Sequence, residues 1–162
     1  MAKVILICGK ICCGKSYYAN QLKTRENAVI LSCDEMTSIL FDNDLGDRHE
    51  QMIIKIKDYL LKKSVELVKA NCNVILDWGF WTKKERDLTR KYFNEQNIAT
   101  EFHYINVDEK TWLKNIEERN NNVVAGKSGS NYYLDEGLKN KLLSMWEEPN
   151  KAEIDFWIEV NR

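Results

Sequence analysis

Short apolar runs alternate along the chain with longer segments in which apolar residues recur at helical spacing. Runs that are apolar on both faces are typical of strands in a parallel sheet that helices cover on both sides. The predicted strands are Val4–Cys8, Ala28–Leu31, Asn73–Leu76, Phe102–Val107 and Ile154–Val160.

Helices are predicted between these strands. They cover Lys15–Arg25, His49–Asn71, a segment opening at Thr82, a segment opening at Asp108 and a last one around Gly137–Glu147. Thr82 and Glu85 form a capping-box pattern, and Asp108 is expected to cap its helix. The side chains expected to face inward are Ile53, Ile56, Leu60, Leu67, Leu88, Tyr92, Trp112, Leu113 and Ile116.

The alternation predicts an α/β fold with three layers, a parallel sheet between helices joined by right-handed crossovers. A single domain over residues 1–162 is expected. The segment from Asn120 to Gly137 interrupts the pattern, because it is rich in Asn, Gly and Ser. We expect a long mobile loop there, acting as a lid over about residues 119–137.

Composition narrows the class of protein. Hydrophobic residues make up 44% and charged residues 30% of the chain, which is typical of a soluble globular protein. No apolar run is long enough for a membrane span, and no signal peptide is evident, so a cytoplasmic location with no membrane partner is expected. The five cysteines are expected to be reduced thiols. The net charge of −1 argues mildly against sequence-independent nucleic-acid binding.

A phosphate-binding motif follows the first predicted strand. Residues 9–16 fit G-x-x-x-x-G-K-[ST] in full and precede a predicted helix, which is the expected context; the alternative is a plain glycine-rich turn. Backbone N–H groups of such a loop hold phosphate oxygens, Lys15 reaches the β- and γ-phosphates of ATP, and Ser16 offers its hydroxyl to Mg²⁺. The residues expected to contact the nucleotide are Gly9, Lys10, Ile11, Cys12, Cys13, Gly14, Lys15, Ser16 and Tyr17.

Carboxylates follow the second and third strands, and ligands of parallel sheets bind at those carboxyl ends. Asp34 is placed to take the proton of an acceptor hydroxyl, and Asp77 to support Mg²⁺ together with Ser16. The alternatives are a helix N-cap for Asp34 and a hydrogen-bonding strand-end role for Asp77. Asp34 and Glu35 come too soon after the phosphate-binding loop to be the acidic pair of an ATPase, and Asp77 is followed by Trp78 and not by a glutamate. Neither strand therefore supplies a convincing base for hydrolysis.

Phosphoryl transfer also needs cations around the migrating group. Arg119 is expected as a catalytic lid arginine, with a charge at a helix C-terminus as the alternative, and Lys127 is a weaker candidate. The aromatic residues of Trp78–Trp81 are expected either to line an acceptor pocket or to pack in the core. Cys12 and Cys13 suggest redox inhibition, since loop dipoles could lower a thiol pKa.

Together these motifs resemble one family. The stretches that carry the resemblance are Gly9–Ser16, Ser32–Glu35, Val74–Trp81, Glu117–Asn120 and Trp146–Pro149. They are similar to the AAA-type P-loop kinases, which include polynucleotide kinases, chloramphenicol phosphotransferase and zeta-toxin-like proteins. The resemblance implies a nucleoside-kinase-like core with strand order 2-3-1-4-5, Asp34 as base and Arg119 in the lid. The lid departs from the family, because Asn120–Val123 stands in place of a proline-rich turn.

The leading hypothesis is a Mg²⁺-dependent kinase that moves the γ-phosphate of ATP to a hydroxyl of a small molecule. A kinase of nucleic-acid 5′-hydroxyls is an alternative that needs a basic groove leading to Asp34. A further alternative is an ATP-binding switch or toxin–antitoxin component that transfers little phosphate.

Overall fold

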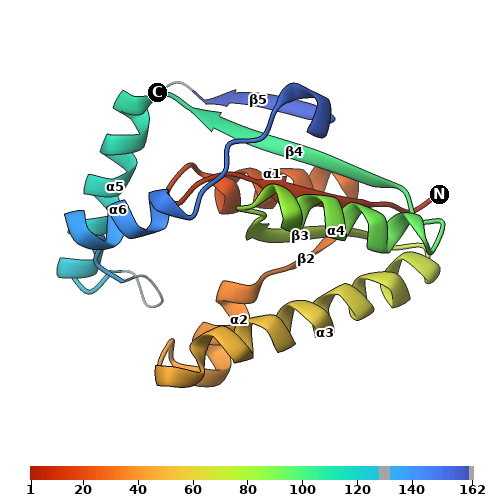
Figure 1. Ribbon diagram of the computed structural model, residues 1–162, viewed down its shortest axis with the longest axis horizontal. Helices are drawn as coiled ribbons and strands as arrows, with labels where there is room; N and C mark the ends of the chain where they lie inside the picture. The colour runs from red at the N-terminus through yellow and green to blue at the C-terminus, as the bar shows by residue number, and fades with distance from the viewer. Residues whose placement is uncertain (128–131, 161–162) are drawn as a thin grey trace.

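Five parallel strands form one sheet in the computed structural model, which describes residues 1–127 and 132–160. The strand order is β2-β3-β1-β4-β5, as the resemblance to the P-loop kinases implied. The strands are β1 (Val4–Cys8), β2 (Ala28–Leu31), β3 (Asn73–Gly79), β4 (Thr100–Val107) and β5 (Phe156–Val160). The arrows of β4 and β5 in Figure 1 point to the left, which is the side where α5 and α6 lie.

Helices connect the strands on both faces of the sheet. The α-helices are α1 (Lys15–Glu26), α2 (Cys33–Phe41), α3 (His49–Lys69), α4 (Lys83–Asn94), α5 (Glu109–Val124) and α6 (Glu136–Ser144). Two 3₁₀ turns, η1 (Gly46–Arg48) and η2 (Lys151–Glu153), complete the described elements. In Figure 1, α2 lies next to the end of β2, and α3 runs along the lower side of the molecule.

The alternation of side chains along β1 divides the core in two. Ile5 and Ile7 belong to a cluster with side chains of α1, α5 and α6, whereas Val4 and Leu6 belong to a cluster with α3 and α4. All four side chains are fully buried. Since successive strand residues point to opposite faces, an apolar strand can serve both layers, and this explains the continuous apolar runs in the sequence.

The third strand is longer than predicted. It continues past Leu76 to Gly79, and Asp77 pairs in register with Ile7 of β1. A carboxylate at this position ended the apolar pattern and therefore the predicted strand. The Asp77 carboxylate can be buried in the strand because the Ser16 hydroxyl donates a hydrogen bond to it.

Two predicted core positions are wrong. Leu88 is 55% exposed and Leu113 is 47% exposed. In α4 the face towards the sheet is formed by Arg86, Thr89 and Phe93 instead. Arg86 can be buried there because it donates hydrogen bonds to the Glu153 carboxylate and to backbone carbonyls, which a search for apolar periodicity does not detect.

One of the two hydrogen bonds of the capping box predicted at Thr82 is present. The Thr82 hydroxyl accepts a hydrogen bond from the backbone N–H of Glu85 at 3.1 Å. The Glu85 carboxylate does not reach back to Thr82; it accepts from the backbone N–H of Trp81 and pairs with Lys57. The N-cap itself is therefore as predicted, and the glutamate connects α4 to α3.

The predicted loop from Asn120 to Gly137 begins and ends in helices. Helix α5 extends to Val124, and α6 begins at Glu136. Gly126, at φ +67°, ends α5 in a Schellman motif, with Lys127 N–H donating to the Asn122 carbonyl. Part of the predicted lid, residues 128–131, lies outside the described residues.

Candidate active site

The loop between β1 and α1 has the conformation that the phosphate-binding motif predicts. Gly14 (φ +96°) is the N-cap of α1, and Cys12 also has a positive φ of 58°. A left-handed residue directly before a helix turns successive N–H groups towards one side of the loop. No capping side chain competes for the N–H groups at the start of α1, so they are available to an anion.

Lys15 folds back over this loop. Its Nζ donates a hydrogen bond to the Lys10 carbonyl at 2.7 Å and lies 3.8 Å from the Cys13 sulfur. The ammonium is therefore held beside the N–H groups that begin α1.

Burial raises the pKa of the Cys13 thiol, although Lys15 lowers it. This direction is opposite to the lowered thiol pKa on which the hypothesis of redox inhibition depends.

Ser16 and Asp77 are in contact. The Ser16 hydroxyl donates to the Asp77 carboxylate at 3.0 Å, although the two residues come from α1 and β3. Asp77 is only 7% exposed, and this burial raises the pKa of its carboxyl, while Lys15 and the Ser16 hydrogen bond lower it and Asp34 raises it further. A hydroxyl and a carboxylate in contact supply oxygen ligands of the kind that Mg²⁺ prefers. These residues thus fit the ion that the sequence analysis expected.

Asp34 is exposed on the first turn of α2. The alternative of an N-cap is wrong for Asp34, because Ser32 is the cap and accepts the N–H of Glu35 at 3.3 Å. Asp34 is close enough to raise the pKa of Asp77. Its carboxylate is therefore free of the capping role.

Helix α5 holds the phosphate-binding loop from behind. The Trp112 indole N–H donates to the Ile11 carbonyl at 2.8 Å, and the Asn115 amide donates to the Cys12 carbonyl at 3.0 Å. These bonds fix two carbonyls on the side of α5. Sequence patterns assigned Trp112 only to the apolar stripe, and Asn115 was missed. The spacing of i and i+3 could have indicated that the two side chains lie on the same face of the helix.

Arg119 continues the same face of α5. Its guanidinium donates to the Cys12 sulfur at 3.7 Å and to the Tyr132 carbonyl at 3.3 Å. The alternative of a C-terminal helix charge is wrong, because α5 continues to Val124 and its last turn has no basic residue. Lys127 lies at an exposed position after the helix end.

Two aromatic residues that follow Asp77, Trp78 and Phe80, pack in or against the core clusters. Phe80 is fully buried and packs edge-to-face on Phe102, with ring centroids 5.5 Å apart, so it is a core residue. Trp78 is half-buried next to Cys33 and Leu60 of the small cluster between α2 and α3. Within the described residues its indole N–H is buried without a hydrogen-bond partner.

Carboxylates dominate the acceptor side, by which we mean the surroundings of Asp34 and Cys33. Burial raises the pKa of Cys33 to about 12; Lys57 lowers it, and Asp34, Glu85 and Asp77 raise it. Lys57 is bonded to Glu85. The nearby cation is thus already neutralised by a carboxylate.

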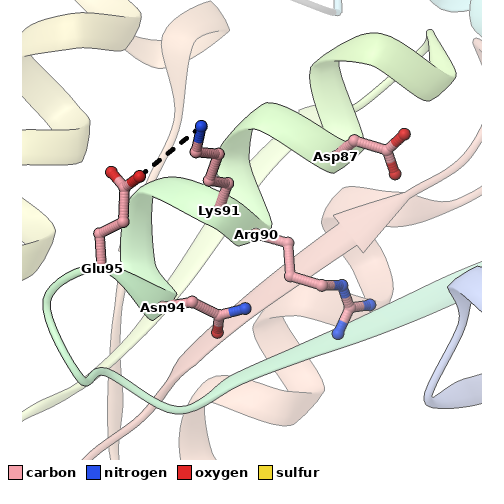
Figure 2. Close-up of a pocket in the computed structure, with 5 residues that line it drawn as sticks. All are labelled: Asp87, Arg90, Lys91, Asn94 and Glu95. Atoms are coloured by element: carbon pink, nitrogen blue, oxygen red, sulfur yellow. Dashed lines mark ion pairs between the residues drawn. The ribbon is translucent and has the colours of Figure 1, made fainter.

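A separate hollow lies on the outer surface of α4 and is shown in Figure 2. It is lined by Asp87, Arg90, Lys91, Asn94 and Glu95. The Lys91 ammonium pairs with Glu95 at 3.7 Å, and the Arg90 guanidinium packs on the Phe102 ring. These charges serve structural contacts, and the phosphate-binding loop contributes no residue to this hollow.

Comparisons with known proteins show the family of the chain and its fold. The model of a family described as an AAA domain matches residues 4–131, so the chain belongs to that family, whose P-loop kinase members the sequence analysis named. In the described part of the chain, no helix has the length and apolarity that a membrane crossing requires. No curated protein matched the sequence.

Solved structures share the fold. Chaetomium thermophilum Kti12, in complex with ADP-AlF3, superposes with a TM-score of 0.71 at 15% identity over 97% of this chain and 88% of that one. The Mycobacterium tuberculosis APS kinase CysC, in complex with AMPPNP and APS, gives 0.61 at 15% identity over 99% and 90%. A gluconokinase from Sinorhizobium meliloti gives 0.60 at 13% identity over 98% and 81%. At these identities the likeness establishes the P-loop kinase fold.

Proposed function

We propose that this protein is a kinase that transfers the γ-phosphate of ATP to a hydroxyl of a small molecule. The observation that carries the proposal is the arrangement around Asp77. Its carboxylate is bonded to Ser16 of the phosphate-binding loop, and the exposed Asp34 lies within electrostatic reach of it. This arrangement supports a nucleotide site and a candidate base at the same edge of the sheet.

The nucleotide would be held by the chain's own loop. Backbone N–H groups of residues 9–17 bind the phosphates, and Lys15 lies over the loop beside them. Ser16 and Asp77 hold Mg²⁺, which when bound neutralises charge on the β- and γ-phosphates. Arg119, fixed at Cys12, supplies a further positive charge at the migrating group.

The transfer step needs one base and no covalent intermediate. Asp34 accepts the proton of the acceptor hydroxyl while the oxygen of that hydroxyl forms a bond to the γ-phosphorus. The bond from that phosphorus to the β–γ bridging oxygen breaks, and ADP leaves with the electron pair. No glutamate follows Asp77 to activate water, which favours transfer over hydrolysis.

The charges favour a small acceptor over a nucleic acid. A polyanion needs unpaired Lys and Arg along its path, and the acceptor side presents carboxylates with Lys57 already paired to Glu85. The net charge of −1 points the same way. The likeness to the gluconokinase and APS kinase folds is compatible with small acceptors.

The test is incubation with γ-labelled ATP, Mg²⁺ and separate acceptor pools: nucleosides, sugars and sugar nucleotides, antibiotics, oligonucleotides with free 5′-hydroxyls, and a small-molecule cell extract. Label in an organic small-molecule product supports the proposal. Label in the oligonucleotides favours the nucleic-acid alternative. Label released only as inorganic phosphate, or not released at all, favours an ATP-binding switch.

A further inference from the structure

Trp81 differs from the aromatic residues that precede it. Trp78 and Phe80 pack in or against core clusters, whereas Trp81 belongs to none of the clusters formed by the described residues. Its side chain is half-buried. Core packing therefore does not account for where this ring lies.

The backbone of Trp81 is held from two sides. Its N–H donates to the Glu85 carboxylate at 3.2 Å, and its carbonyl accepts the N–H of Glu147 at 2.8 Å. The preceding Phe80 has a positive φ of 48°, and its carbonyl accepts a hydrogen bond from the buried Arg86 at 3.0 Å. These bonds fix the turn from which the Trp81 side chain projects.

The Trp81 indole lies against the junction of β3 with the phosphate-binding loop. A Cβ atom at Gly79 would collide with the Nε1 atom of the indole, and it would lie 2.6 Å from the indole Cδ1 atom and 3.2 Å from the Gly9 carbonyl oxygen. The Gly9 N–H in turn donates to the Gly79 carbonyl at 3.0 Å. Glycine at position 79 therefore lets the N–H edge of the indole come close to the first residue of the loop.

The indole N–H is an unused donor at this place. Among the described residues, the hydrogen bonds of Trp81 are those of its backbone, and no acceptor is bonded to Nε1. An indole N–H can only donate, and the oxygens of a phosphate group can only accept when they are ionised. A free donor beside an anion-binding loop thus points to an oxygen of the anion that the loop binds.

We infer that the Trp81 indole N–H donates a hydrogen bond to an oxygen of the γ-phosphate of ATP. The inference rests on the proposed function. The loop N–H groups nearest α1 cradle the α- and β-phosphates, whereas Gly9 lies at the opposite end of the loop. Trp81 also follows Asp77, the carboxylate that we place at Mg²⁺, beyond the end of β3. Trp81 therefore recognises the phosphate that is transferred and makes no such contact with ADP.

Nucleotide binding in the presence of Mg²⁺ separates this contact from a structural role. Trp81→Phe keeps an aromatic ring and removes the donor. Its affinity for a non-hydrolysable ATP analogue should fall about 10-fold, for loss of a hydrogen bond to a charged oxygen, while its affinity for ADP stays within about 2-fold of the wild type. Titration calorimetry measures both nucleotides. Equal losses for both, or no loss for either, would overturn the inference.

The donor can also be observed directly. In the ¹H–¹⁵N spectrum of the wild type, the indole N–H signal of Trp81 is the one that is absent from Trp81→Phe. Its proton resonance should move downfield with the ATP analogue and Mg²⁺, and much less with ADP and Mg²⁺. A signal that stays in place, or that moves equally with both nucleotides, would show that the indole does not contact the γ-phosphate.

Trp157 is the matched control. It is also half-buried, but its indole N–H already donates to Glu159 at 2.8 Å, and it lies on the edge strand β5. Trp157→Phe should bind both nucleotides like the wild type, and the same selective loss in this variant would count against the inference. If the wild type binds neither nucleotide, the proposed function fails. Binding of both nucleotides with an unmoved Trp81 signal overturns the inference alone.

Discussion

Among single residues, Asp77 lowers the stability of the folded protein because its carboxylate is buried. A carboxylate that is 7% exposed lacks the hydration it would have in the unfolded chain, and burial accordingly raises its pKa. The folded protein then binds a proton more readily than the unfolded chain does. The ionised carboxylate at neutral pH therefore opposes folding, and we attribute its presence to Mg²⁺ binding.

Asp77→Asn should separate the two properties. With the buried charge removed, the thermal midpoint of the ligand-free protein at neutral pH is expected to rise, while Mg²⁺-dependent binding of an ATP analogue weakens. Calorimetry of both variants, with and without Mg²⁺ and analogue, measures both changes. A lower midpoint together with normal Mg²⁺-dependent binding would show that Asp77 is structural.

Asp34→Asn should affect chemistry alone. The residue is exposed and does not cap α2, so stability and ATP-analogue binding should match the wild type. Loss of a general base should reduce transfer by about 10²–10⁴-fold. Binding is measured by titration calorimetry and transfer by labelled product. Parallel loss of binding and transfer would contradict a role as base.

At the scale of elements, α5 is the support of the phosphate-binding loop. Trp112 and Trp78 allow a matched comparison, because one indole N–H donates to the Ile11 carbonyl and the other has no partner in the described residues. Replacing a donor leaves a buried carbonyl unsatisfied, whereas replacing an unpaired donor removes an existing penalty.

Trp112→Phe should therefore lower the free energy of unfolding by about 1–3 kcal/mol more than Trp78→Phe does. It should also weaken binding of the ATP analogue, since the loop carbonyl at Ile11 loses its anchor. Urea unfolding and analogue titration of both variants provide the test. Equal losses of stability with unaltered analogue affinity in both would contradict the support role.

The elements also show what sequence patterns can predict. Buried strands and the phosphate-binding motif could be predicted because apolar runs and fixed glycines are local signals. Helix α5 beyond Arg119 was missed because three asparagines follow that residue and interrupt the apolar pattern, and the helix end at Gly126 depends on backbone geometry. The contacts of Asn115 and Tyr132 could not be predicted, since they join segments far apart in the chain.

At the scale of the whole molecule, the two core clusters both draw on β1, β3 and β4. We propose that residues 1–162 therefore unfold as one cooperative domain.

A buried polar side chain, that of His103, connects α1 to this core. His103 is 3% exposed, and its ring nitrogens contact the Tyr18 hydroxyl at 2.8 Å and the Glu101 carboxylate at 3.3 Å.

His103 should make stability depend on pH. Burial lowers its pKa, with Glu101 opposing, so below the unfolded value of 6.5 the unfolded chain takes up a proton that the folded protein resists. The free energy of unfolding is expected to fall as the pH is lowered below about 6.5. His103→Gln should reduce this fall, and His49→Gln, at an exposed position, should not. Identical profiles for all three proteins would contradict the assignment.

The proposed function requires ATP and an acceptor hydroxyl to meet between the phosphate-binding loop and Asp34. It is tested most directly by following γ-label from ATP into a small-molecule cell extract with the wild type, Asp34→Asn and Lys15→Ala. We expect a labelled organic product with the wild type, almost none with Asp34→Asn despite normal binding of the ATP analogue, and loss of both binding and product with Lys15→Ala. Equal label in inorganic phosphate from the wild type and Asp34→Asn, with no organic product, would contradict it.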